Sequence, residues 1–209
     1  MTKVLYTIGY SCFKIEDFIN VLKKYNINCV IDVRSNPNSK FHTDYNKDYL
    51  EGVLGNNGIY YRNYAKEFGA RQENTKYFTD GYLDFDKFSK SEIFLSGVEK
   101  LIKSMEKNYT FALMCAEKDP ATCHRNIMIA KEFKKRGYQV NNIWDNGEIE
   151  TQDDVEKRLI NCYFPDRNQL SLFGEQLTEE EMIQQAYSLR NKEIGFKFDD
   201  KKELGDLYE

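Results

Sequence analysis

Long apolar runs are missing from this sequence of 209 residues. No stretch approaches the roughly 20 residues that a membrane-spanning helix needs, which argues against an integral helical membrane protein. The first residues, MTKVLYTIGYS, lead directly into a strand-like run and lack the charged and apolar regions of a secretory signal. We therefore expect a cytoplasmic protein.

A C-x-x-C pair is also missing, although the chain contains Cys12, Cys29, Cys115, Cys123 and Cys162. An odd number of scattered cysteines indicates reduced thiols rather than a disulfide framework. A strong excess of one charge is lacking as well, because the formal net charge is −4. Any nucleic-acid site therefore has to be a local basic patch.

What the sequence does contain is a regular alternation of strand-like and helix-like segments. The expected strands cover residues 3–10, 28–35, 59–64, 109–115 and 138–145, and the expected helices cover 14–26, 46–58, 91–108, 124–137 and 151–164. Such alternation predicts an α/β fold with a mainly parallel sheet of about five strands and helices on both faces, a Rossmann-like three-layer arrangement.

The composition changes near residue 164, which predicts two parts. Residues 1–164 form the expected α/β domain. Residues 165–209 read as a linker, a capped helix over 178–193 and a charged end, which together make a C-terminal helical tail.

The pentapeptide QLSLF lies in this tail and resembles the segment by which bacterial DNA polymerases and repair proteins bind the sliding clamp. In that binding mode, leucine and phenylalanine enter an apolar pocket and glutamine forms hydrogen bonds. We expect Gln169, Leu170, Leu172 and Phe173 to contact a bacterial sliding clamp. The alternative is that the apolar side chains attach the tail to the domain.

The most reactive part of the sequence is MCAEKDPATCHR, residues 114–125, directly after an expected strand. Zinc prefers four ligands, whereas Cys115, Cys123 and His124 supply three. We also expect adjacent Cys123 and His124 not to face one ion. The sequence therefore predicts no metal and no cofactor.

A reactive thiol is a second interpretation of this loop. Cys123 lies near the start of the next helix and beside His124, which would activate its sulfur. Cys115 reads instead as a small buried residue, as free cysteines usually are.

An anion site is the interpretation that we favour, because ligands of parallel α/β sheets bind at the carboxyl ends of the strands. The phosphate-binding candidates at these ends are Ser11, Arg34, Lys118 and Arg125. Asp32 and Glu117 are candidates for acid–base catalysis, with Cys123 and His124 as a possible reactive pair. The alternative is that Asp32–Arg34 and Glu117–Arg125 are only buried ion pairs.

Aromatic residues gather near the same strand ends. Tyr10 and Tyr61 are our candidates for stacking on a base of a nucleic acid or nucleotide. Packing in the core is the competing explanation.

Four stretches together resemble a bacterial and archaeal family called domain of unknown function 488. They are YTIGYS, DVRSNPNSKF, GIYYRNYAKEFGA and MCAEKDPATCHRNIMIA, and the likeness covers roughly residues 3–145. The family pattern usually has histidine, arginine and glycine where this sequence has Tyr10, Lys40 and Ala70. The resemblance implies an α/β fold without a settled activity.

These observations lead to one main functional hypothesis and two alternatives. The main hypothesis is a DNA-processing or repair-associated protein that holds DNA or a nucleotide at the strand ends and is recruited to the sliding clamp. The first alternative is a non-catalytic, clamp-associated adaptor that binds nucleic acid or a nucleotide. The second is a small-molecule phosphate or thiol enzyme.

Overall fold

The computed structural model describes residues 3–167 and 177–197 and contains a six-stranded sheet in the order β3-β2-β6-β1-β7-β8. The strands are β1 (Val4–Gly9), β2 (Cys29–Asp32), β3 (Tyr60–Asn63), β6 (Phe111–Cys115), β7 (Gln139–Ile143) and β8 (Ile149–Thr151). All neighbours pair in parallel except β7 and β8. The predicted α/β fold with a mainly parallel sheet is therefore confirmed, with β8 as an additional antiparallel edge strand.

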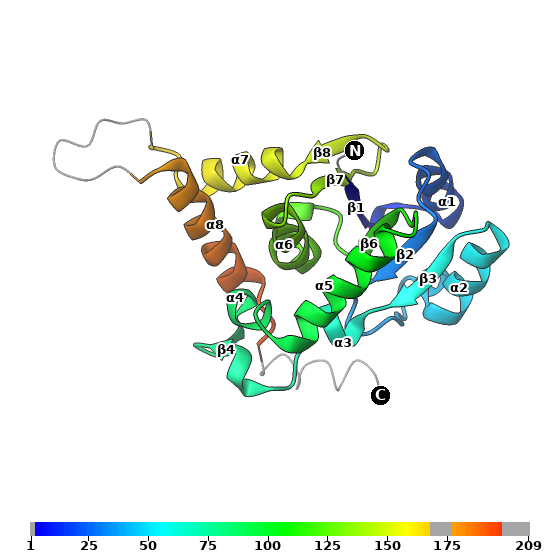
Figure 1. Cartoon of the computed structure of the whole chain (residues 1–209), viewed down its shortest axis with the longest axis horizontal. Helices are drawn as coiled ribbons and strands as arrows, with labels where there is room; N and C mark the ends of the chain where they lie inside the picture. The colour runs from blue at the N-terminus through cyan, green and yellow to red at the C-terminus, as the bar shows by residue number, and fades with distance from the viewer. Residues whose placement is uncertain (1–2, 168–176, 198–209) are drawn as a thin grey trace.

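Helices cover both faces of this sheet, and an apolar cluster lies on each face (Figure 1). Helices α1 (Ile15–Lys24) and α2 (Lys47–Asn56) cover one face. The other face carries α5 (Glu92–Met105), the π-helical segment η5 (Arg125–Ala130), α6 (Lys131–Lys135) and α7 (Gln152–Tyr163). The domain therefore has three layers.

Local sequence signals explain where these helices begin. Ser91 caps α5 by accepting a hydrogen bond from the backbone N–H of Phe94. Thr151 and Asp154 form a reciprocal capping box at the start of α7, in which each side chain accepts from the backbone of the other. Both caps agree with the sequence pattern.

The segment between β3 and α5 has no single period because it consists of short elements. They are α3 (Ala65–Phe68), η3 (Thr75–Tyr77), β4 (Phe78–Thr79), β5 (Tyr82–Leu83) and α4 (Phe85–Phe88). Phe68, Leu83 and Phe88 from this segment are fully buried in the cluster beside α5. It therefore forms part of the domain core.

The chain reverses its direction across the sheet at the adjacent strands β1 and β6. After β1 the chain passes through α1 to β2 on one side, whereas after β6 it passes through η5 and α6 to β7 on the other. In open α/β sheets, ligands bind at the carboxyl ends of the strands beside such a switch point. This topology determines where the reactive loop lies.

Helix α8 (Glu179–Ile194) packs against α7 and shares the core on that face. Its Tyr187 is 2% exposed; the Tyr187 hydroxyl accepts a hydrogen bond from Gln152 and donates one to Glu156. The QLSLF residues Gln169–Phe173 lie outside the described residues.

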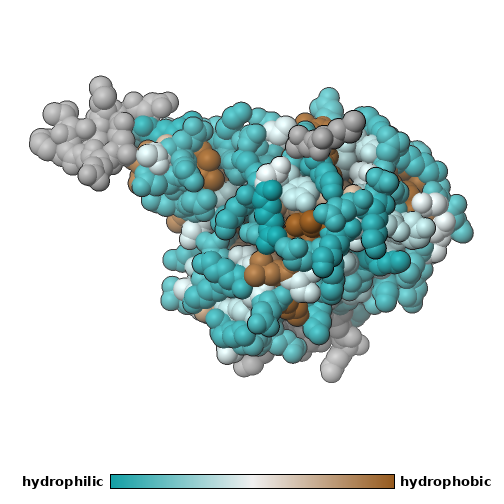
Figure 2. Space-filling model, in the orientation of Figure 1, coloured by the Kyte–Doolittle hydropathy of each residue, from teal (hydrophilic) through white to brown (hydrophobic). Residues whose placement is uncertain are grey.

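Hydrophilic residues dominate the face of the molecule seen in Figure 2, with a few apolar side chains near its centre. Within residues 3–167 and 177–197, no helix has the length and apolar character needed to cross a bilayer.

A Tyr187→Phe substitution tests how firmly α8 is attached to the domain. We expect the free energy of unfolding in urea to fall by about 1 to 3 kcal/mol, because two buried hydrogen bonds are lost. The control is Tyr60→Phe, since Tyr60 is 51% exposed and should change stability little. Equal stability of the two variants would contradict the buried role of the Tyr187 hydroxyl.

Candidate functional site

The candidate site is built where β1 and β6 end side by side. Gly9 and Cys115 are paired in register, and the backbone N–H of Ser11 donates to the carbonyl of Ala116 at 3.2 Å. A Cβ atom at Gly9 would lie only 2.0 Å from the carbonyl oxygen of Glu117. Only glycine therefore allows the loop after β6 to lie this close to β1.

Four reactive side chains converge in this loop: Cys115, Glu117, Cys123 and His124. One ligand atom from each lies within 4.8 Å of the ligand atoms of the others. Our expectation that Cys123 and His124 would not face one point was therefore wrong, because the turn before η5 brings both side chains to the same side. Glu117 is a fourth potential metal-binding side chain, in addition to the three that the sequence predicted.

The orientation of the His124 ring is determined by two contacts. Its Nε2 lies 3.0 Å from the carbonyl oxygen of Val33, at the end of β2. Its Nδ1 lies 3.8 Å from the sulfur of Cys115. Since a carbonyl can only accept a hydrogen bond, Nε2 carries a proton and Nδ1 faces the sulfur atoms.

The two thiols of the cluster differ in acidity. Burial raises the pKa of Cys115 well above its ordinary value, and the neighbouring Cys123 raises it further. Burial also opposes ionisation of Cys123, but Cys115, Arg125 and His124 outweigh it and place the pKa of Cys123 well below its ordinary value. Cys123 is therefore the more acidic thiol of the pair, although it is only 1% exposed.

Glu117 is the solvent-exposed member of the cluster. Its Oε2 nevertheless lies 3.0 Å from the Cys123 sulfur. Burial of the carboxyl group and the adjacent Cys123 raise the pKa of Glu117 above its ordinary value. The carboxyl group thus connects the buried sulfur atoms with solvent.

Arg125 is fully buried and holds the loop against β1. Its Nη1 donates to the Glu117 carbonyl at 2.5 Å and its Nη2 to the Lys118 carbonyl at 3.3 Å, while its Nε lies 3.3 Å from the Thr7 hydroxyl. The guanidinium thus binds the backbone of Glu117 rather than its carboxylate. These contacts occupy the guanidinium N–H groups of Arg125, which we expected to bind phosphate.

The helix that follows the cluster begins as a π-helix. All six residues of η5, Arg125–Ala130, are buried. π-Helical turns are rare and are frequent at functional sites, because the wider turn redirects side chains. Arg125 is the first residue of this segment, and Cys123 and His124 directly precede it.

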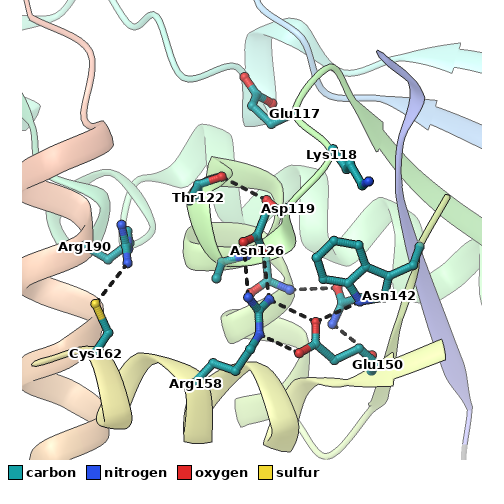
Figure 3. Close-up of polar contacts among 12 residues, drawn as sticks. Glu117, Lys118, Asp119, Thr122, Asn126, Asn142, Glu150, Arg158, Cys162 and Arg190 are labelled. Atoms are coloured by element: carbon teal, nitrogen blue, oxygen red, sulfur yellow. Dashed lines mark hydrogen bonds and ion pairs between the residues drawn. The ribbon is translucent and has the colours of Figure 1, made fainter. Parts of the chain in front are cut away.

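A second set of contacts fixes the turn η4 (Pro120–Thr122) that leads to Cys123 (Figure 3). Asp119 caps this turn by accepting from the backbone N–H of Ala121. Arg158, on α7, donates to both carboxylate oxygens of Asp119 and to both of Glu150. Asp119, Arg158 and Glu150 were not among the predicted site residues, because 39 residues separate Asp119 from Arg158 and no local pattern connects them.

Asp32 and Arg34 form a buried ion pair on the α1 and α2 side of the sheet, at 2.6 Å. Asp32 also accepts from the Tyr61 hydroxyl at 2.7 Å, and Arg34 donates to the Tyr10 hydroxyl at 3.2 Å. The pairing matches the structural alternative that we gave for these two charged residues. This network supports the end of β2.

Tyr10 and Tyr61, the candidates for base stacking, are each 3% exposed. The Tyr10 ring stacks on Tyr45, and the Arg34 guanidinium lies over it. Stacking of a base on either ring would therefore require displacement of neighbouring side chains.

The remaining predicted phosphate ligands, Ser11 and Lys118, are exposed. Lys118 forms an ion pair with Asp145 at 2.5 Å, in which the two side chains are 48% and 38% exposed. Such surface pairs contribute little stability, so a bound anion can replace Asp145 at low cost.

A Gly9→Ala substitution tests the close approach of β1 to the loop. We expect unfolding free energy to fall by about 1 to 3 kcal/mol, because the added methyl group meets the Glu117 carbonyl. The matched control is Gly52→Ala on α2, where the added methyl group meets nothing within 4 Å and should stabilise the helix by about 0.5 to 1 kcal/mol. Urea denaturation measures both, and an unchanged Gly9→Ala variant would contradict the packing described.

Comparison with known proteins gives one family match. No curated protein and no solved structure matches the chain. The sequence profile of a family described as domain of unknown function DUF488 matches residues 14–131, which include the whole reactive loop and η5. The chain therefore belongs to the DUF488 family.

Proposed function

We propose that this protein is a hydrolytic enzyme that acts on a nucleotide or nucleic-acid substrate at the carboxyl ends of β1 and β6. The observation that carries the proposal is the position of Glu117, an exposed residue whose carboxylate lies 3.0 Å from the buried Cys123 sulfur. A carboxylate at the mouth of a polar cluster is suited to transfer protons between water and a substrate.

Accessibility favours hydrolysis through Glu117 over thiol catalysis. Cys115 and Cys123 are 3% and 1% exposed, so the protein covers both sulfur atoms. A nucleophilic sulfur has to approach the reacting carbon or phosphorus atom directly. Glu117, in contrast, is an exposed residue.

The charge at the mouth of the site supports an anionic substrate. Lys118 follows Glu117 directly, and its exposed pair with Asp145 is readily exchanged for a phosphate group. Ser11 lies on the neighbouring strand end and adds a hydroxyl group. Together these groups support binding of a substrate that carries phosphate.

The proposed reaction is tested with nucleosides, nucleotides and single-stranded oligonucleotides that carry normal and modified bases. We expect the full-length protein to add water to one class, as detected by mass spectrometry, and Glu117→Gln to slow the reaction by about 100-fold or more. The control is Glu51→Gln, an exposed carboxylate on α2, which should leave the rate unchanged. Failure of the folded wild type to hydrolyse any of them would reject the proposal.

A second candidate function, recruitment to replicating or repaired DNA, is favoured by the QLSLF sequence. We expect the full-length protein to bind a bacterial sliding clamp with micromolar affinity and Leu172→Ala/Phe173→Ala to abolish binding, because both apolar anchors are removed. Surface plasmon resonance measures this, with Leu189→Ala on α8 as the control. Equal binding by the double variant would rule out the peptide as the docking segment.

A further inference from the structure

We infer that Cys115, Cys123 and His124 bind one zinc-class transition-metal ion, with the fourth coordination position left to a water molecule on the side of Glu117. The inference deepens the proposed hydrolytic function and rests on it for the reaction that the ion would serve. The binding itself depends only on the geometry of the cluster.

The distances in the cluster approach those of a tetrahedral site. Metal–sulfur bonds of about 2.3 Å and metal–nitrogen bonds of about 2.05 Å place two sulfur ligands about 3.8 Å apart, and sulfur and nitrogen about 3.6 Å apart. The Cys115 sulfur and His124 Nδ1 are separated by 3.8 Å. All candidate ligand atoms, including the Cys123 sulfur, lie within 4.8 Å of one another.

The tautomer of His124 is the one that a metal ligand needs. Its Nε2–H donates to the carbonyl of Val33 at 3.0 Å, which leaves the lone pair of Nδ1 directed at the sulfur atoms. Metal-binding histidines almost always donate their other ring N–H to a carboxylate, a carbonyl or water, because this contact fixes the ring. The end of β2 supplies that contact here.

The charges around the cluster balance when a divalent cation is present. Metal binding requires both cysteines as thiolates, and these would carry three negative charges together with the carboxylate of Glu117. Arg125, which is fully buried beside them, and a divalent cation carry three positive charges. A buried group of charges is stable when it is paired and hydrogen-bonded in this way.

The type and number of the ligands indicate the ion and its role. Two thiolates and an imidazole favour zinc over magnesium or calcium, which prefer oxygen ligands. Three protein ligands with one open position are typical of catalytic zinc, whereas structural zinc usually has four. The ligands come from the end of β6 and from the turn before η5, and Arg125 and Arg158 hold the loop between them.

Glu117 then has a defined task in hydrolysis. The water on the ion gives one proton to the Glu117 carboxylate, and the remaining hydroxide forms a bond to the electrophilic atom of the substrate. The bond to the leaving group breaks, and Glu117 returns the proton to that group, so that the net reaction consumes one water. Two cysteines, one histidine and a non-coordinating glutamate perform this chemistry in zinc-dependent nucleobase deaminases, which fits a nucleobase as the reacting group.

Metal analysis of the full-length protein tests the inference without any substrate. After production with added zinc and gel filtration, we expect about one zinc ion per chain by plasma mass spectrometry. Cobalt in place of zinc should give the charge-transfer absorption of a thiolate–cobalt bond. Cys115→Ser, Cys123→Ser and His124→Gln should each weaken zinc binding by more than the 10- to 100-fold that loss of an outer contact costs.

The chain offers matched controls for each ligand type. Cys162→Ser changes an exposed cysteine, and His42→Gln changes the only other histidine of the sequence. Both variants, and Glu117→Gln, should retain the full zinc content. Loss of zinc in Glu117→Gln would overturn the open fourth position, and loss in either of the other controls would overturn the ligand assignment.

A readout that does not depend on folded variants is protection of the wild-type thiols. Removal of zinc with a chelator should increase the rate at which Cys115 and Cys123 are alkylated and leave the rate at exposed Cys162 unchanged, as followed by peptide mass spectrometry. Absence of zinc from the folded wild type, or a disulfide between Cys115 and Cys123 in its place, would overturn the inference. Glu117-dependent hydrolysis by a metal-free protein would overturn the zinc site and leave the proposed hydrolytic function standing. Zinc binding without hydrolysis would support the zinc site and reject the proposed hydrolytic function.

Discussion

The buried guanidinium of Arg125 holds together the two strand ends on which the candidate site is built. It donates to two carbonyls of the loop after β6 and contacts Thr7 of β1. Burial of a full charge is costly unless its donors are satisfied and an opposite charge lies near. The carbonyls satisfy the donors, and the acidic groups Cys123, Cys115 and Glu117 nearby raise the pKa of Arg125.

Support for the loop also comes from far along the chain. Arg158 of α7 binds Asp119 and Glu150 at the same time, and the Arg158 guanidinium lies over the ring of Trp144. Asp119 in turn caps the turn before Cys123. Positioning of a reactive cluster within fractions of an ångström requires such outer contacts, because the cluster residues alone do not fix one another. The family match covers the loop and η5 but ends before Arg158.

Much of the fold followed from patterns that act over short distances. The stripe of Ile15, Phe18 and Leu22 is buried on α1, and Thr151 forms the capping box that its sequence indicates. β8 was not anticipated, because three half-buried residues in a hairpin carry too little periodicity. The short elements between β3 and α5 were missed for the same reason: their residues become buried only through contacts with distant helices.

The sequence by itself determined the longer helices and strands, the three-layer architecture and the loop in which the chemistry is concentrated, because helix and strand periodicity and strand-end placement are local properties. Only the tertiary structure decided what the residues of that loop do. It turned Arg34 and Arg125 from expected phosphate ligands into internal supports, and it brought the side chains of adjacent Cys123 and His124 to one point with Cys115 and Glu117. The physical reason is that the direction of a side chain at a turn depends on the surrounding hydrogen bonds. Here these come from β1, β2 and α7, which are far away in sequence.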